Sequence, residues 1–231
     1  MSENPSPPGL RPGPGAPPPG TPARFPIVDG VPPGRALLGA RIRELIEASV
    51  RVRDDEADLA AAARRVEAVT EALRAAGGAN PLLLAALEGG GHLSVNNPLE
   101  GPGNPLAPPL SWVRVGPESV RADVLLGAAH EGPPGRVHGG WVAAVLDHVL
   151  GRATAAAGFP GMTASLTVDY HQGTPYAVPL TAEGRLVRRD GRKLHAAAEL
   201  KAGDVVCATA TAILVHFGAD RFPVAAKSTT D

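Results

Sequence analysis

The sequence predicts an α+β fold in which one long, buried helix packs against one curved antiparallel sheet. Two observations carry this prediction. Residues 140–157 repeat apolar side chains with the period of a helix, whereas the segments between 162 and 217 alternate with a period of two. No second helical pattern follows residue 158, which excludes a repeated strand–helix–strand design. A single helix covering a single sheet is then the economical arrangement.

Composition excludes several classes of protein. The chain has 231 residues, which suffices for one sizeable core with an appendage. A net charge of −1 and an aromatic content of 3% argue against a nucleic-acid partner. The single cysteine, Cys207, allows neither a disulfide within the chain nor a cysteine-based zinc site, and we expect no metal. Without a secretory pattern or an apolar run of about 18–20 residues, we expect a cytoplasmic protein with no membrane partner.

The first part of the chain lies outside the predicted core. Residues 1–34 contain 12 Pro and 6 Gly, so we predict a disordered or polyproline-like tail. Residues 35–78 repeat apolar side chains at spacings of three and four, which indicates a helical extension. Asp54 or Asp55 could cap a second helix, so the pattern allows one long helix or two shorter ones. Residues 79–109 are rich in turn formers and are predicted to be a connector loop, in which 81–87 could add a helical turn.

The predicted sheet domain spans residues 110–217. It opens with a hairpin whose strands are 111–115 and 119–129, and a rigid loop at 131–135 leads into the helix. Four strands follow the helix, with Asp-Gly and Gly-Asp pairs at two of their turns. We place these strands at 162–170, 179–188, 193–200 and 205–217, and a fraying tail at 218–231.

The predicted helix has two different faces. Its bulky side chains form one face and are expected to meet the sheet. The other face carries small residues and one acid, which would let a second backbone or a ligand approach closely. The bulky face comprises Val142, Val145, Leu146 and Val149, and the small-residue face comprises Ala143, Ala144, Asp147, Gly151 and Thr154.

The acid on the small-residue face is the first candidate for chemistry. His138 and Asp147 are nine residues apart, about 900° on a continuous helix, and would point to opposite sides. Either His138 lies in the loop before the helix, or the pair is completed between two subunits of a two-fold dimer. Backbone N–H groups of Gly139 and Gly140 at the helix N-terminus are suited to polarising a carbonyl oxygen.

Together these groups describe hydrolysis of an acyl group. Asp147 would act as the nucleophile or as a general base for a water molecule, and Thr163 or Ser165 could orient that water. The competing interpretation is a buried structural acid, which is the commoner role for a lone Asp.

Several stretches resemble the PaaI-like hotdog-fold acyl-CoA thioesterases over roughly residues 110–217. The similar segments are 135–140, Asp147, 162–170 and 191–193. The resemblance implies a homodimer, or a dimer of dimers, with active sites at the subunit interface. It further implies that Asp147 activates water or attacks the thioester, and that the Gly139 N–H polarises its carbonyl. His138 would then assist positioning and Thr163 would hold the water. Coenzyme A is part of the substrate, so no separate cofactor is implied.

Two departures from that family limit what carries over. Glu131-Gly132-Pro133-Pro134 stands where some relatives have an Asn in the loop before the His-Gly-Gly motif, and His171-Gln172-Gly173-Thr174 replaces a basic-Pro turn. We therefore expect no Asn contribution to carbonyl binding.

Substrate binding is expected beyond the acid itself. A basic cluster at one predicted hairpin is either a coenzyme A phosphate site or a solvated turn. The predicted substrate-binding residues are Gly140, Ser165, Arg188, Arg192 and Lys193.

Two alternatives to a thioesterase are compatible with the predicted fold. A hotdog dehydratase or hydratase would need a His beside the acid, but His148 points about 100° away from Asp147 on the helix, which also disfavours a metal pair. A non-catalytic acyl-CoA-binding module, whose N-terminal helix engages a partner, is the other alternative.

Overall fold

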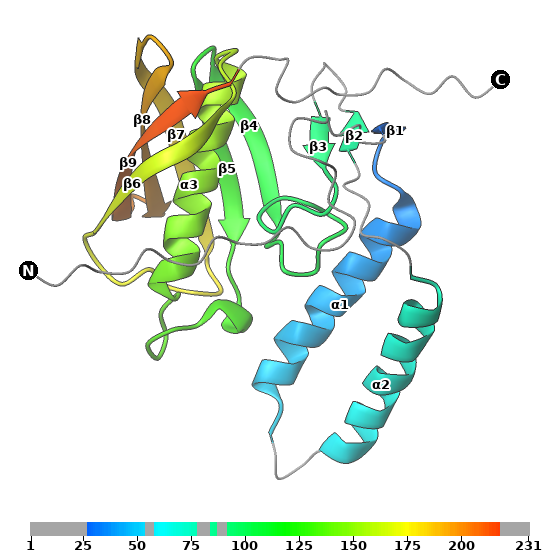
Figure 1. The fold of residues 1–231 in the computed structure, drawn as a ribbon. Helices are drawn as coiled ribbons and strands as arrows, with labels where there is room; N and C mark the ends of the chain where they lie inside the picture. The colour runs from blue at the N-terminus through cyan, green and yellow to red at the C-terminus, as the bar shows by residue number, and fades with distance from the viewer. Residues whose placement is uncertain (1–26, 54–57, 78–83, 87–91, 218–231) are drawn as a thin grey trace, which may run out of the picture.

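The computed structural model describes residues 27–53, 58–77, 84–86 and 92–217. Within it, a six-stranded antiparallel sheet wraps around one long helix, α3 (Gly139–Ala156), as Figure 1 shows. The order of strands is β4-β5-β7-β8-β9-β6, so β4 and β6 form the two edges. This arrangement confirms the predicted hotdog fold. The strands are β4 (Leu110–Gly116), β5 (Ser119–Leu125), β6 (Gly161–Tyr170), β7 (Pro179–Asp190), β8 (Lys193–Ala202) and β9 (Val205–His216).

Alternation along the strands produces the core. Strand β5 buries every second side chain against α3, and β7 and β8 do the same. At Gly184 the helix lies so close that an added Cβ would be 2.6 Å from Val149 Cγ1. The buried residues of α3 are Val142, Val145, Leu146, Val149, Leu150, Ala153 and Thr154.

The placement of Thr154 on the small-residue face was wrong. Thr154 is fully buried, and its hydroxyl donates to the Gly151 carbonyl at 3.0 Å. The chain turns back over the last turn of α3, where the Phe159 N–H donates to the Thr154 carbonyl at 2.9 Å. Packing after the helix therefore covers a position that the helical period alone left open.

A bulge in β6 changes which side chains share a face. Thr163 pairs with Leu214, whereas Ser165 pairs with Ile213, the neighbouring residue of β9. Ala164 is thus the extra residue of a β-bulge. Strict alternation placed Thr163 and Ser165 on the same side. The bulge instead turns Thr163 towards the helix side, with the buried Leu214, and Ser165 towards the outer face of the sheet.

The N-terminal extension contains two helices, α1 (Pro33–Arg51) and α2 (Leu59–Ala75). Helix α1 begins at a proline, which is favoured in the first turn because its missing N–H would have no partner there. Asp58, rather than Asp54 or Asp55, caps α2 by accepting the Ala61 N–H at 2.8 Å. The pattern is therefore resolved in favour of two helices.

Three short strands add a second sheet next to these helices. Strand β1 (Ile27–Asp29) pairs in parallel with β2 (Leu84–Ala86), which pairs antiparallel with β3 (His92–Ser94). Part of the predicted tail and part of the predicted loop are therefore ordered into strands, and the suggested helical turn at 81–87 was wrong for 84–86. The rest of the tail, 1–26, and the segment 218–231 lie outside the described residues.

Helix α1 is attached to the sheet domain by its polar side chains. The Glu47 carboxylate accepts the N–H groups of Ala128 and Ala129 at 3.0 and 3.1 Å, at the start of the 3₁₀ helix η1 (Ala128–His130). Arg43 donates to the Ala107 carbonyl at 2.6 Å. Helix α2, in contrast, has no buried residue. Of the helices in the described ranges, none combines the length and the apolar character that crossing a bilayer requires.

Candidate active site

The N-terminus of α3 is held by the side chain of its own cap. His138 precedes the helix with extended backbone angles, and its Nδ1 accepts the Gly140 N–H at 3.0 Å. The His138 N–H donates to the His130 carbonyl at 2.9 Å. A side chain at Gly132 would approach the His138 Cα to 2.8 Å, so the loop fits closely around this residue. His138 therefore lies in the loop before the helix, which was one of the two predicted alternatives.

This cap occupies one of the two glycine N–H groups that were predicted to bind a carbonyl oxygen. Because the Gly140 N–H is bound to His138, it is not available to a carbonyl oxygen, and the expectation of two free donors is corrected. The Gly139 N–H has no hydrogen-bond partner among the residues that the structure describes. It lies at the first position of α3, where the helix dipole favours negative charge.

Tyr170 holds the same turn, although it was not among the predicted site residues. Its hydroxyl donates to the Gly139 carbonyl at 2.9 Å from the end of β6. A Cβ at position 139 would lie 3.4 Å from the Tyr170 ring, which is ordinary van der Waals contact. Tyr170 therefore fixes the peptide that presents the free N–H. Only its alternation with Leu166 and Val168 signalled that it faces the helix.

Asp147 lies in the middle of α3, half-buried, and Thr163 holds its carboxylate. Thr163 Oγ1 donates to Asp147 Oδ1 at 2.7 Å. The bulge at Ala164 makes this contact possible, because it turns Thr163 towards the helix. The resemblance implied that Thr163 holds a water, whereas in the structure its hydroxyl binds the carboxylate directly. The second carboxylate oxygen, Oδ2, is left for other partners.

A pocket of about 270 Å³ opens beside this carboxylate. It is formed by the exposed side of α3 and by the start of β6. Its lining residues include Asp147, His148, Gly151, Arg152 and Thr163.

The two halves of the candidate chemistry are far apart within one chain. Gly139 and Asp147 belong to the same continuous helix and are eight residues apart. At a rise of about 1.5 Å per residue, this separation is about 12 Å along the axis. One carbonyl group therefore does not contact the Gly139 N–H and the Asp147 carboxylate of a single chain at the same time.

The predicted binding residues do not gather around Asp147. Ser165 and Arg188 line a different hollow, of about 400 Å³, on the outer face of the sheet. Arg192 Nε donates to the His216 carbonyl at 3.3 Å, and Lys193 is exposed at the start of β8. The neighbouring Arg189 guanidinium covers the Phe159 ring at 4.5 Å. The basic cluster is thus divided between the outer face and the turn after α3.

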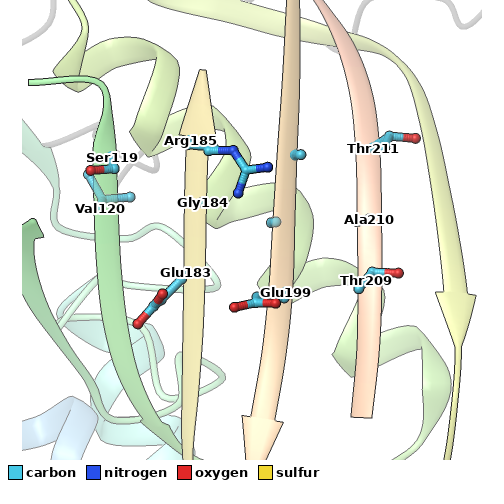
Figure 2. A pocket seen from close by; sticks show the side chains of 11 residues that line it. Ser119, Val120, Glu183, Gly184, Arg185, Glu199, Thr209, Ala210 and Thr211 are labelled. Atoms are coloured by element: carbon cyan, nitrogen blue, oxygen red, sulfur yellow. The ribbon is translucent and has the colours of Figure 1, made fainter. Parts of the chain in front are cut away.

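Figure 2 shows a further hollow of about 250 Å³ on the outer face of the sheet. Glu183 and Glu199 lie directly opposite each other on β7 and β8, and Arg185 is two residues from Glu183. These side chains alternate with the buried ones, so they point away from α3. The hollow contains none of the candidate catalytic residues.

A buried cluster of Glu100 with two basic side chains of α3 was not predicted from the sequence. The Glu100 side chain is 7% exposed, and its Oε2 lies 3.2 Å from His148 Nε2 and 3.3 Å from Arg152 Nε. Burial, the largest influence, would raise the pKa of Glu100, but contacts with His148, Arg152 and Trp112 outweigh it and hold the pKa below its ordinary value. Glu100 belongs to an irregular loop without periodicity, so no pattern signalled its contact with the helix.

No group of three or more His, Cys, Asp or Glu side chains suited to a metal occurs in the described ranges.

Comparisons with known proteins agree with the fold. A family model described as the thioesterase superfamily matches residues 134–213, which include His138, Asp147 and Thr163. A crystal structure described as a thioesterase superfamily protein is 33% identical, with a TM-score of 0.72, and the match covers 84% of this chain and 100% of that one. The chain belongs to the thioesterase superfamily.

The match to that superfamily structure includes part of the N-terminal extension, because residues 110–217 are less than half of the chain. Curated members of the superfamily are similar over a shorter region. Acyl-coenzyme A thioesterase THEM4 of Xenopus laevis is 32% identical over 74 residues, which is 32% of this chain and 33% of that protein. THEM4 of Rattus norvegicus is 31% identical over 93 residues, 39% of this chain and 40% of that protein. The chain thus matches about a third to two-fifths of the length of these relatives.

Proposed function

We propose that this protein hydrolyses acyl-CoA thioesters to a free acid and coenzyme A. The observation that carries the proposal is the Asp147 carboxylate, held by Thr163 at the wall of a pocket. Membership of the thioesterase superfamily and the similarity to proteins named acyl-coenzyme A thioesterase support it. We assign the reaction to residues 110–217, and we treat the N-terminal helices as an extension of this domain.

Each group has a defined task in the proposed reaction. The Gly139 N–H donates to the thioester carbonyl oxygen and stabilises the negative charge that develops there. Asp147 accepts a proton from water while the water oxygen bonds to the carbonyl carbon. The tetrahedral intermediate then breaks its C–S bond, and the proton from Asp147 goes to the departing coenzyme A sulfur. His138 keeps the turn in place through its bond to the Gly140 N–H.

Direct attack by Asp147 on the carbonyl carbon is the alternative route. It would form a mixed anhydride and release the thiolate before water enters. Single-turnover hydrolysis in ¹⁸O-labelled water, combined with hydroxylamine trapping, distinguishes the two routes. Label in the Asp147 carboxylate, or an Asp147 hydroxamate formed from the trapped anhydride, supports direct attack. Label found only in the free acid, with no Asp147 hydroxamate, supports the general base.

We further propose that the site is shared between two chains of a homodimer. The distance of about 12 Å along α3 leaves the Gly139 N–H and Asp147 unable to serve one carbonyl within a chain. In a two-fold dimer with antiparallel α3 helices, Asp147 would face the partner's Gly139. Strand β6 offers an unpaired edge for this contact in the described structure, with Met162 and Tyr170 64% and 54% exposed.

Coenzyme A would bind through the basic residues at the β7–β8 turn. Arg192 and Lys193 are exposed there, and both can contact phosphate oxygens. Arg188 and Ser165 lie on the outer face instead, where they would meet only a part of coenzyme A that passes over the edge strand. A cytoplasmic location is compatible with this substrate.

Measurement of coenzyme A release over a panel of acyl-CoA substrates tests the proposed activity. We expect turnover by the wild type and a loss of at least about 100-fold in Asp147→Asn, as expected when a general base is removed. Equal turnover by both proteins would overturn the mechanism. Tight binding of acyl-CoA without any turnover would instead favour a non-catalytic binding module.

A mixing experiment tests the shared site. Asp147→Asn and Gly139→Pro chains are each expected to be inactive, and chains are exchanged between dimers by dilution and reconcentration. A mixed dimer retains one intact site, formed by Asp147 of one chain and the partner's Gly139, so about a quarter of wild-type activity should return at equal mixing. No recovery, with mixed dimers shown by mass spectrometry, would mean that each site belongs to one chain.

A further inference from the structure

The loop that carries Glu100 is built to hold this side chain in one place. Asn97 Oδ1 accepts the N–H groups of Leu99 and Glu100 at 2.8 and 3.1 Å. A side chain at Gly101 would lie 2.4 Å from the Asn97 N, so the turn is tightly closed. Helix α1 braces the following residues, because Arg43 donates to the Asn104 carbonyl at 3.2 Å. The loop therefore delivers a carboxylate to α3 at a fixed position.

Glu100 engages two basic side chains that stand on consecutive turns of α3. His148 and Arg152 are four residues apart, and both contact the same carboxylate oxygen. The Arg152 guanidinium also lies over the Trp112 ring, with its carbon 5.2 Å from the ring centroid. Both basic side chains are therefore directed towards β4 and the loop.

The same two basic residues line the pocket that contains Asp147. Arg152 is five residues beyond Asp147, about 7.5 Å along the helix axis and about 140° around it. Gly151 lies between them, and an added Cβ there would meet only open space. An arginine side chain is long enough to cross such a gap, and a guanidinium pairs readily with a carboxylate. In the structure, Arg152 contacts Glu100 and Trp112 instead.

We propose that Glu100 is a positioning residue that retains Arg152, and with it His148, against the Glu100 loop and β4, so that the Asp147 carboxylate stays free for water. The inference rests on the proposed function, since it concerns the base of that reaction. Without the Glu100 charge, the guanidinium turns across Gly151 and forms an ion pair with Asp147. The paired carboxylate then has one oxygen on Thr163 and the other on Arg152, and it accepts a proton less readily.

Kinetics of single and double variants test this role. In Glu100→Gln, kcat is expected to fall about tenfold, with KM changed by less than about threefold. Addition of Arg152→Gln to Glu100→Gln removes the competing cation and should restore most of kcat. A second substitution does not repair a simple packing defect, so recovery identifies the positioning role. Glu100→Asp keeps the carboxylate and serves as the matched control, with activity near that of the wild type.

A crystallographic comparison gives a readout that needs no activity. In the wild type, the Arg152 guanidinium should contact Glu100, and in Glu100→Gln it should lie within about 4 Å of the Asp147 carboxylate. A guanidinium that keeps its position in Glu100→Gln, or a double variant as slow as the single one, would overturn the inference. If the wild type hydrolyses no acyl-CoA, the proposed function fails, while the crystal structures still decide the position of Arg152.

Arg152→Gln alone keeps the test decisive if Glu100→Gln does not fold. In the wild type, the Arg152 guanidinium is paired with Glu100 and does not contact the substrate. Removal of this guanidinium should therefore change kcat/KM by less than about threefold. A loss beyond about tenfold would show that Arg152 acts on the substrate itself, and the positioning role of Glu100 would be refuted.

Discussion

The N-terminus and the middle of α3 are held in different ways. At the N-terminus, His138 caps the helix, and His130 and Gly132 shape the turn from within the preceding few residues. In the middle, Asp147 is bound by Thr163 from β6 and stands beside two basic side chains that contact Glu100, which belongs to a loop far earlier in the chain. The first region presents a backbone group and the second a side chain. Removal of a backbone N–H at the N-terminus of α3 should therefore abolish activity without loss of the fold. In the middle of α3, activity should instead depend on side chains from distant parts of the chain.

Gly139→Pro should have the largest effect. Proline is tolerated at the first position of a helix, and His138 already has the extended backbone that precedes a proline. The substitution removes the free N–H and keeps the helix start, so we expect kcat to fall about 10²–10³-fold, as for loss of one oxyanion donor. Thermal unfolding should stay within about 3 °C of the wild type.

Gly139→Ala is the control for this change. It keeps the N–H, and its Cβ would lie 3.4 Å from the Tyr170 ring, in ordinary contact. A loss of activity as large as that of Gly139→Pro would show that the shape of the turn, and not the N–H donor, matters at this end of α3.

Thr163→Val should have the next largest effect, and it addresses the middle of the helix. It removes the hydroxyl that donates to Asp147 Oδ1 at 2.7 Å but keeps the size of the side chain. A hydrogen bond to a charged group contributes about 1.5–3 kcal/mol, so a loss of at least about tenfold in kcat is expected. Thr163→Ser keeps the hydroxyl and should retain most activity. If steady-state kinetics find Thr163→Val as active as Thr163→Ser, the Thr163 hydroxyl has no role in the proposed reaction.

The same difference explains how much the sequence predicted. The helix, its glycine turn and the strands were predictable because local periods and turn residues specify them, and His138 was correctly allowed a place before the helix. Thr163 was predicted beside Asp147, but strict alternation also placed Ser165 there, since nothing local marks the bulge at Ala164. Glu100 was not predictable, because a loop without periodicity gives no direction for its side chains. Long-range contacts account for each of these errors.

Glu47→Gln tests whether the N-terminus of α3 is independent of the extension. Glu47 accepts the N–H groups of Ala128 and Ala129, and η1 in turn supplies the carbonyl that binds the His138 N–H. Loss of a charged cap should lower the free energy of unfolding by about 1 kcal/mol, measured by urea titration, with kcat unchanged. A parallel fall in kcat would mean that α1 takes part in holding the turn, and the local account of this end would be incomplete.

The smallest effect should come from His130, whose ring lies at the same end of the helix. Burial, the largest influence, lowers the pKa of His130 below its ordinary value of 6.5, and the Gly127 backbone and the Glu47 charge oppose it only in part. The unfolded chain therefore binds a proton more readily, and stability should be lost as the pH falls from above 6.5 through the pKa of the folded state. The low pKa values of Glu47 and Glu100 act separately, in the window below 4.5.

His130→Asn isolates this contribution. An asparagine oxygen can replace Nδ1 as acceptor for the Gly127 N–H but does not titrate in this range. Between pH 7 and 5.5, the decrease in Tm should be smaller in the variant than in the wild type by about 1–2 °C. The other histidines are common to both proteins, so their effects cancel in the comparison. An equal decrease in Tm in both proteins would show that other groups cause the pH dependence of stability. Protonation of His130 would then not affect the stability of the turn before α3.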